Sequence, residues 1–182
     1  MPPGSDRWPP ALREQLPVPS RPAGVLIPIM ERGGGLSVLL TQRSAALKHH
    51  AGQVSFPGGG MEEHDVDVLA TALRETHEEV GIEPQYVAVI GYLGPMGTTT
   101  GYAVTPVVGL VSDEAELRVD PTEVEFTFEV PLEFLLDQGN QRAVERRFLG
   151  HTLAMIEFQY EGQRIWGATA QMLLNLRKNL IK

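Results

Sequence analysis

The order of strand-like and helix-like segments is the feature that most constrains this fold. Only two long stretches, residues 67–80 and 167–180, space their apolar residues by three and four as an amphipathic helix requires. Residues 131–136 suggest one short helix. Short β-rich runs occupy residues 24–30, 36–42, 86–93, 103–111, 124–130 and 152–160. Because these segments do not alternate as regular strand–helix–strand units, the sequence predicts an α+β fold, an α/β/α sandwich with a mixed β-sheet between helices.

The first 22 residues differ from the rest because they contain seven of the chain's fourteen prolines. Each proline removes a backbone N–H donor and restricts the residue before it, so this segment cannot run as a helix or a central strand. Only residues 8–16 offer a short helical turn there. We therefore expect residues 1–22 to form an extension and residues 23–182 to form one domain.

Charge and cysteine content exclude several classes of function. The chain has 15 Lys and Arg against 23 Asp and Glu, a net charge of −8, and both a nucleic-acid-coating surface and a polybasic membrane patch need the opposite balance. The absence of cysteine excludes disulfide scaffolds, thiolate zinc sites and cysteine nucleophiles. No apolar run approaches the ~20 residues of a membrane-spanning helix, and the N-terminus lacks the pattern of a secretory signal. We expect a cytoplasmic protein, a monomer or homodimer, with no nucleic-acid or membrane partner.

The first long helix carries an acidic cluster. Glu75, Glu78 and Glu79 stand at i, i+3 and i+4, so three carboxylates share one helix face within a single turn. Hard oxygen ligands gathered in this way suit a divalent cation such as Mg²⁺, whereas a solvated acidic face is the common alternative. Arg74 precedes the cluster and is placed to pair with Glu78 at i+4. Gly81 is a suitable stop for the helix.

A glycine-rich loop, Phe56-Pro57-Gly58-Gly59-Gly60, leads toward this helix. Glycines let the backbone approach a ligand closely, and backbone N–H groups in such a loop can contact phosphate oxygens. A glycine triplet by itself is usually a turn. Placed before an acidic helix, it indicates a loop–helix unit that holds metal ions near a pyrophosphate.

With these residues in view, the chain resembles the Nudix hydrolase family, whose box reads G-x5-E-x7-R-E-U-x-E-E-x-G-U, with U a bulky aliphatic residue. The second half of the box is matched by Arg74, Glu75, Thr76 in the first U place, Glu78, Glu79, Gly81 and Ile82. The first half allows two alignments. Counting from Gly60 puts Val66 in the glutamate place, whereas counting from Gly59 puts Asp65 there, with eight residues instead of seven before Arg74.

A second resemblance, to the coenzyme A pyrophosphatase subfamily, covers the segment just before the box. That subfamily carries L-L-T-x-R-S-x3-R-x3-G-x3-F-P-G-G, and Lys48 stands in the place of its second arginine. The other matched positions are Leu39, Leu40, Thr41, Arg43, Ser44, Gly52, Phe56, Pro57, Gly58 and Gly59. The resemblance implies that substrate is bound by Arg43, Ser44, Lys48, Gly52, Phe56, Gly58 and Gly59.

The family resemblance implies a Nudix fold with a loop–helix–loop catalytic motif and a metal-dependent hydrolase. For coenzyme A, or its oxidised or acylated forms, the products would be 3′,5′-ADP and 4′-phosphopantetheine. Glu75, Glu78 and Glu79 would hold Mg²⁺ or Mn²⁺, and Arg74, Glu78 and Glu79 would form the catalytic group. The base that accepts the proton of the attacking water is left open among Glu78, Glu79, Glu123 and Glu125.

Three other functions stay open at this point. One is a Nudix hydrolase of another nucleoside diphosphate derivative, such as ADP-ribose. Another is a catalytically silent Nudix domain that senses a ligand, although such a domain is expected to have lost its metal carboxylates. The third is a non-enzymatic acidic metal-binding domain, which leaves the glycine loop and the upstream motif unexplained.

Overall fold

The computed structural model describes residues 21–47, 49–148 and 150–181, so Lys48 and the helical turn predicted at residues 8–16 lie outside the described residues. The main sheet has the strand order β3-β2-β1-β7-β5, with β8 paired to β2, β4 to β1 and β6 to β7. A second sheet has the order β11-β10-β9. The strands are β1 (Arg21–Arg32), β2 (Gly35–Arg43), β3 (Val54–Ser55), β4 (Gly58–Gly60), β5 (Val87–Tyr92), β6 (Met96–Gly97), β7 (Tyr102–Val111), β8 (Val124–Pro131), β9 (Arg142–Phe148), β10 (His151–Tyr160) and β11 (Gln163–Ile165).

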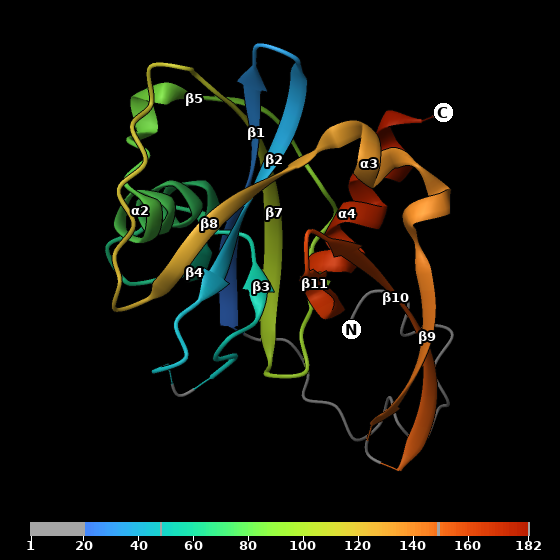
Figure 1. Cartoon of the computed structure of the whole chain (residues 1–182). Coiled ribbons are helices and arrows are strands. Elements are labelled where there is room, and N and C mark those ends of the chain that lie inside the picture. Colours follow the sequence, from blue (N-terminus) through green and yellow to red (C-terminus); the bar gives the residue numbers. More distant parts are fainter. Residues whose placement is uncertain (1–20, 48, 149, 182) are drawn as a thin grey trace.

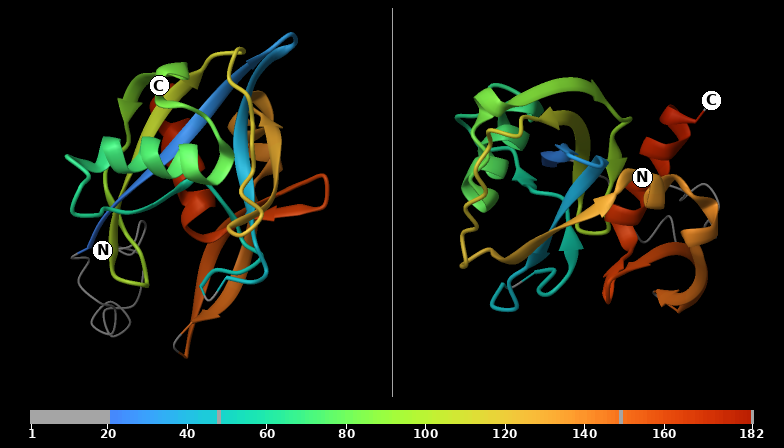
Figure 2. Two further views of the ribbon diagram at one scale, coloured as in Figure 1. Left: turned by 90° about the vertical axis from the view of Figure 1, so that its left-hand side faces the viewer. Right: turned by 45° about the horizontal axis from the view of Figure 1, so that its top comes forward.

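The helices cover the two faces of the main sheet. They are α2 (Val68–Val80), α3 (Leu132–Leu136) and α4 (Gly167–Leu180), with short 3₁₀ turns at Pro84–Tyr86 and Gln138–Asn140. Figure 1 shows α2 on one side of the sheet and α4 with α3 on the other, and the turned view in Figure 2 places α2 in front of the sheet and α4 behind it. Strand β1 runs parallel to β7 and antiparallel to β2, so the sheet is mixed. The predicted α/β/α sandwich is confirmed.

Local sequence signals define the ends of α2. The Asp67 side chain accepts a hydrogen bond from the Ala70 N–H at 2.8 Å, which caps the N-terminus, and Gly81 ends the helix with a φ of 78°. The buried face of the helix, with Ala72 and Val80, packs on side chains of β1, β2 and β7. Gly24 in β1 makes this contact possible, because a Cβ at that position would collide with the backbone oxygen of Val68.

The opposite face of the sheet is closed by α4. Leu173 and Leu176 belong to the largest cluster of buried apolar residues, together with Val38 and Phe56. The Thr169 hydroxyl donates a hydrogen bond to the Val54 carbonyl at 2.9 Å and ties the start of α4 to β3. The chain therefore shares one core from β1 through its last helix.

Most of the predicted elements are confirmed, including the hairpin of β1 and β2 around Gly33 and Gly34. Strand β1 begins at Arg21, so Arg21 and Pro22 belong to the sheet and not to the expected proline-rich extension. Pro22 is tolerated there because it lies at the start of the strand. Strand β9 was not predicted, since four of its seven residues are charged; Figure 1 shows it reaching beyond the main sheet with β10. Within the described ranges, no helix is long and apolar enough to cross a membrane.

Candidate active site

Arg74, in the middle of α2, is the centre of an ion-pair network that joins this helix to the loop before it. Its Nη1 donates to Glu75 Oε1 at 2.9 Å and to Glu78 Oε2 at 3.0 Å. Its Nε and Nη2 donate to the two carboxylate oxygens of Asp65, each at 2.9 Å. The predicted pair between Arg74 and Glu78 at i+4 is therefore confirmed, and the guanidinium fixes three carboxylates at once.

Asp65 takes the acid position that the sequence left undecided. Its carboxylate is buried and also accepts hydrogen bonds from the Glu62 N–H at 2.9 Å and the Thr71 hydroxyl at 3.0 Å. Val66, the other candidate, is 87% exposed. The hydrogen bonds from Arg74 hold the pKa of Asp65 well below its usual range. Eight residues instead of seven separate Asp65 from Arg74, but the segment before α2 still brings the Asp65 carboxylate to the Arg74 guanidinium.

Glu79 is the most deeply buried carboxylate of the site, with 1% of the residue exposed. It accepts hydrogen bonds from Arg43 Nη1 on β2 and from the backbone N–H of Gly58 on β4, both at 3.2 Å. Burial raises its pKa to about 7, while the Arg43 charge and the Gly58 hydrogen bond act in the opposite direction. Arg43, predicted to bind substrate, has Glu79 as its partner in this structure.

Glu75 lies directly over the backbone of Gly59. A Cβ at Gly59 would come within 2.5 Å of the Glu75 carboxylate, so only glycine leaves room for this approach. Burial raises the pKa of Glu75, and the Arg74 charge opposes the rise. The Glu78 side chain is 53% exposed. The three predicted metal ligands thus share one turn of α2 but differ widely in burial.

The carboxylates fit a divalent cation by their chemistry and charge. Glu123 lies close enough that its charge contributes to raising the pKa of both Glu75 and Glu79, after burial and other causes. Together with Asp65 and Glu78 this gives five carboxylates against two arginines, Arg43 and Arg74. Across the described part of the chain, no three His, Cys, Asp or Glu side chains are already arranged as a metal cage. The donor atoms are nonetheless the oxygens that Mg²⁺ and Mn²⁺ prefer, and the excess negative charge favours a cation.

Three predicted substrate-binding residues that the structure describes between β2 and β4, Ser44, Gly52 and Phe56, have partners within the protein. The Ser44 N–H donates to the Glu123 carbonyl at 2.8 Å, and the Ser44 hydroxyl accepts from the Ala46 N–H at 3.3 Å. Gly52 has a φ of 65° and its carbonyl accepts from the Gln42 side chain. Phe56 is 3% exposed and packs in the main core. Phe56 therefore contributes to the core, and its contact with substrate stays a prediction.

The glycine triplet forms strand β4 rather than an open loop. Gly58, Gly59 and Gly60 pair antiparallel with Val25, Gly24 and Ala23 of β1. A Cβ at Gly58 would come within 2.5 Å of the β1 backbone. The glycines thus allow β4 to pack closely against β1, and the Gly58 N–H donates a hydrogen bond to the Glu79 carboxylate.

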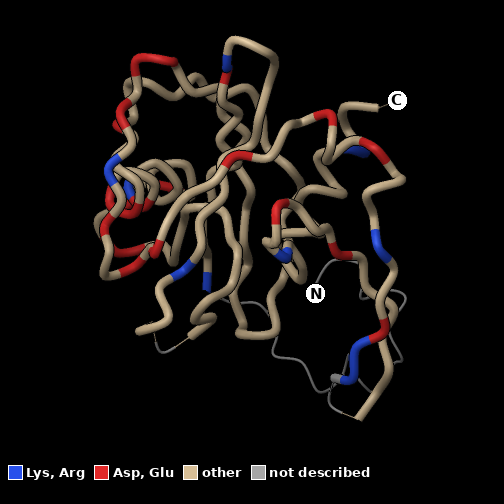
Figure 3. Tube along the Cα trace, in the orientation of Figure 1, with Lys and Arg blue, Asp and Glu red and all other residues tan. Residues whose placement is uncertain are grey.

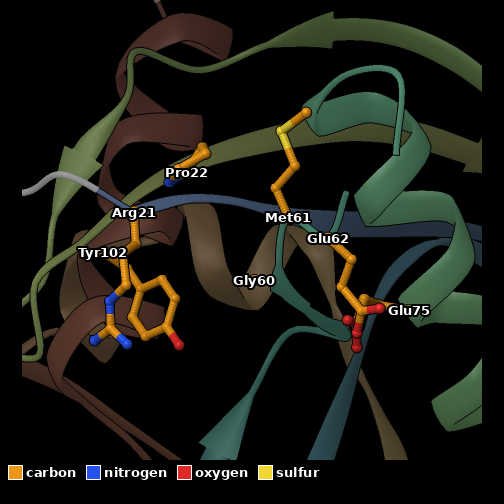
Figure 4. Close-up of a pocket in the computed structure, with 7 residues that line it drawn as sticks. All are labelled: Arg21, Pro22, Gly60, Met61, Glu62, Glu75 and Tyr102. Atoms are coloured by element: carbon orange, nitrogen blue, oxygen red, sulfur yellow. The ribbon is translucent and has the colours of Figure 1, made fainter. Parts of the chain in front are cut away.

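Two residues beside the site were not foreseen. Arg21 and Tyr102 line a pocket of about 440 Å³ together with Glu75 (Figure 4). They are register partners at the starts of the parallel strands β1 and β7. No sequence signal connects positions so far apart, so only the strand pairing reveals them.

Comparisons with known proteins agree with this geometry. Residues 20–151 match the NUDIX domain family. A protein of Shigella flexneri serotype 5b (strain 8401), named "Uncharacterized Nudix hydrolase NudL", is 43% identical over 168 residues, which are 91% of this chain and 87% of that protein. A protein of the same name from Escherichia coli O1:K1 / APEC is 44% identical over 156 residues, 86% of this chain and 81% of its own length.

Solved structures with a similar fold include a Nudix hydrolase from M. smegmatis, RenU, with a TM-score of 0.58 and 16% identity over 87% of this chain and 84% of that one. The NUDIX domain of Shewanella oneidensis NrtR, complexed with ADP ribose, has a TM-score of 0.56 and 16% identity over 96% of this chain and 95% of that one. At these identities the likeness shows the fold alone.

Proposed function

This chain belongs to the NUDIX domain family and is a Nudix hydrolase, and from that premise we propose that its substrate is coenzyme A. The proposed reaction is metal-dependent hydrolysis of the diphosphate bond, giving 3′,5′-ADP and 4′-phosphopantetheine. Oxidised and acylated coenzyme A are included in the proposed substrate class, because the reacting diphosphate is the same.

The contact between Arg43, Glu79 and Gly58 carries this proposal. Arg43 and Gly58 belong to the segment 39–59 that resembles the coenzyme A pyrophosphatases, and Glu79 belongs to the acidic helix. Arg43 Nη1 and the Gly58 N–H both donate hydrogen bonds to the buried carboxylate of Glu79. The subfamily-like segment is therefore built into the acidic site and does not lie elsewhere on the surface, which supports a role for it in the same reaction.

Glu75, Glu78 and Glu79 would hold the cation, as Nudix hydrolases generally use divalent metal ions such as Mg²⁺ or Mn²⁺. A bound cation supplies neutralisation of the diphosphate charge and a water of lowered pKa. Arg74 keeps Glu75 and Glu78 in place. Lys48 and the segment around Ser44 and Gly52 would contact the substrate.

For the general base, the proximity of Glu123 to Glu75 and Glu79 favours it over Glu125, which is exposed. Its backbone carbonyl is tied to the Ser44 N–H at 2.8 Å, so the loop before β8 holds Glu123 beside the upstream segment. Glu123→Gln should lower kcat at unchanged KM, and an unchanged kcat would return the role to Glu78 or Glu79.

The decisive assay incubates the protein with coenzyme A, with and without Mg²⁺, and identifies both products. ADP-ribose is assayed in parallel. Faster hydrolysis of ADP-ribose would replace the substrate assignment, and binding of coenzyme A without turnover of any nucleoside diphosphate derivative would indicate a silent sensing module.

Glu79→Gln tests the metal assignment, because it preserves the size of the side chain and removes its charge. We expect Mg²⁺-dependent turnover to fall by about 10²-fold or more, since metal stabilisation of the transition state is worth several kcal/mol. Glu63→Gln, at an exposed position before α2, is the matched control. Turnover of the Glu79→Gln variant within a few-fold of the wild type would show that the metal assignment is wrong.

A cytoplasmic location and a monomeric or homodimeric state stay predictions from the sequence. Size-exclusion chromatography with light scattering tests the second of these directly.

A further inference from the structure

The pocket beside Glu75 has acidic and basic ends. Glu75 and Glu62 supply its carboxylates, and Arg21 with Tyr102 forms the other side, across the strand that contains Gly60 (Figure 4). Its volume of about 440 Å³ is in the range of small-molecule sites. A substrate group that extends from a diphosphate at Glu75 would therefore reach Arg21 without leaving the pocket.

Arg21 is held in place by two contacts. Its guanidinium carbon lies 4.1 Å from the centroid of the Tyr102 ring, and its Nη2 donates a hydrogen bond to the Thr100 carbonyl at 2.7 Å. The Tyr102 ring is in turn confined by β4, because a Cβ at Gly60 would approach it to 3.2 Å. The side chain is thus ordered before any ligand arrives, which reduces the entropy lost on binding.

Both contacts of Arg21 are with neutral groups. An aromatic ring and a carbonyl orient a guanidinium but leave its positive charge uncompensated. Arg43 is paired with Glu79, and Arg74 with Asp65, Glu75 and Glu78. Among the described arginines of the site, Arg21 alone has no carboxylate of residues 21–47, 49–148 or 150–181 within 4 Å. It is therefore the one placed to receive an anionic substrate group.

We propose that Arg21, positioned by Tyr102, binds the phosphate that the substrate carries outside its diphosphate. The proposal rests on the proposed function, since coenzyme A carries such a group as the 3′-phosphate of its adenosine. A phosphate monoester is close to a dianion at neutral pH and pairs with arginine through two parallel hydrogen bonds. Arg21 would then distinguish coenzyme A from substrates that have only a diphosphate.

The kinetic test compares coenzyme A with 3′-dephospho-coenzyme A. For Arg21→Gln we expect KM for coenzyme A to rise about tenfold or more, with kcat within about twofold and both constants for 3′-dephospho-coenzyme A unchanged. Arg118→Gln makes the same charge change at an exposed arginine outside this pocket. It should leave kcat and KM for both substrates unchanged. An equal effect of Arg21→Gln on both substrates would overturn the proposal.

Tyr102 is tested as a positioning residue. Tyr102→Leu removes the ring that orients the guanidinium and should reproduce part of the KM increase for coenzyme A, whereas Tyr102→Phe should restore wild-type KM. Failure of Tyr102→Phe to restore KM would contradict the positioning role.

Binding of the nucleotide product without metal separates this proposal from the proposed function. Calorimetry in EDTA compares 3′,5′-ADP with 5′-AMP, and the wild type should bind 3′,5′-ADP about tenfold more tightly, a preference lost in Arg21→Gln and retained in Arg118→Gln. Absence of coenzyme A hydrolysis by the wild type would reject the proposed function alone. Equal wild-type binding of the two nucleotides, or a preference for 3′,5′-ADP that is kept in Arg21→Gln, would reject the role of Arg21.

Discussion

Single residues of the site act through partners that a linear motif does not name. Arg43, assigned to the substrate from its place in a motif, donates to the buried carboxylate of Glu79. Arg74, assigned to the catalytic group, holds Asp65 with two hydrogen bonds and also contacts Glu75 and Glu78. The charges of this site are therefore set mainly by pairing inside the protein, and changes to the pairs should be visible in stability as well as in turnover.

Asp65 and Val66 give the sharpest test of the two alignments of the box. Asp65→Asn should lower Tm by a few degrees, because the amide offers Arg74 one acceptor oxygen and turns an N–H group toward the guanidinium. Val66→Ala, at the neighbouring exposed position, should leave Tm unchanged. Thermal unfolding of both variants by circular dichroism decides the matter. Equal changes in the two would contradict the assignment of Asp65.

Glu79 should make the stability of the metal-free protein depend on pH. Its pKa is raised from 4.5 to about 7, so between these values the folded protein keeps a proton that the unfolded chain releases. The free energy of unfolding should therefore fall as pH rises from 4.5 to 7, by up to about 3 kcal/mol from this group, and fall no further above pH 7. Urea unfolding in EDTA at pH 5 and pH 8 measures the slope. Glu79→Gln should flatten it, and an identical slope in both proteins would contradict the raised pKa.

At the scale of elements, the site depends on how closely β4 approaches β1 and α2. The long amphipathic helices and most of the main-sheet strands could be predicted, because their apolar periodicity is a local signal, as is the stop of α2 at Gly81. The glycine triplet was assigned to a phosphate-binding loop, and only the β1 pairing shows that it is a strand. Strand β9 escaped prediction for a related reason, since its charged sequence becomes a strand through pairing with β10. The pairing of one strand with another is what the residues of a single segment do not encode.

Gly59→Ala tests the contact between β4 and α2. The added methyl group would meet the Glu75 carboxylate at 2.5 Å, so this side chain must move while the backbone stays. We expect Mg²⁺-dependent kcat to fall about tenfold or more, with stability changed by less than about 1 kcal/mol, because a flexible side-chain end gives way. Gly34→Ala, in the turn between β1 and β2 with open space around it, is the matched control. Full activity of the Gly59→Ala variant would show that the position of the Glu75 carboxylate does not matter for the reaction.

At the scale of the whole molecule, negative charge is unevenly distributed. Figure 3 shows Asp and Glu gathered over α2 and the segment that leads into β8, while Lys and Arg recur along β9. A net charge of −8 still speaks against binding nucleic acid, but it is compatible with a polyanionic substrate. A divalent cation held by the acidic residues would reverse the sign of the local field, so that acidity becomes the means of binding phosphate.

Mg²⁺ should accordingly stabilise the whole protein. At a concentration one hundred times its dissociation constant, a ligand that binds only the folded state adds about 2.7 kcal/mol, which corresponds to a rise in Tm of roughly 5–10 °C for a chain of this size. Scanning calorimetry with Mg²⁺ and with EDTA measures the difference. The Glu79→Gln variant should lose most of this Mg²⁺-dependent rise in Tm. A rise equal to that of the wild type would indicate that Mg²⁺ binds at another site.

The parallel pairing of β1 with β7 also sets the order in which the chain can fold as it is synthesised. The β1–β2 hairpin leaves the ribosome early, yet the central partner of β1 ends at Val111, about 80 residues after Arg32. At about 5–20 residues per second, the β1 edge therefore waits roughly 4–16 s for β7. During that interval its backbone N–H and C=O groups are open to any extended segment nearby, so the synthesis of β7, rather than that of the hairpin, ends the exposure of this edge.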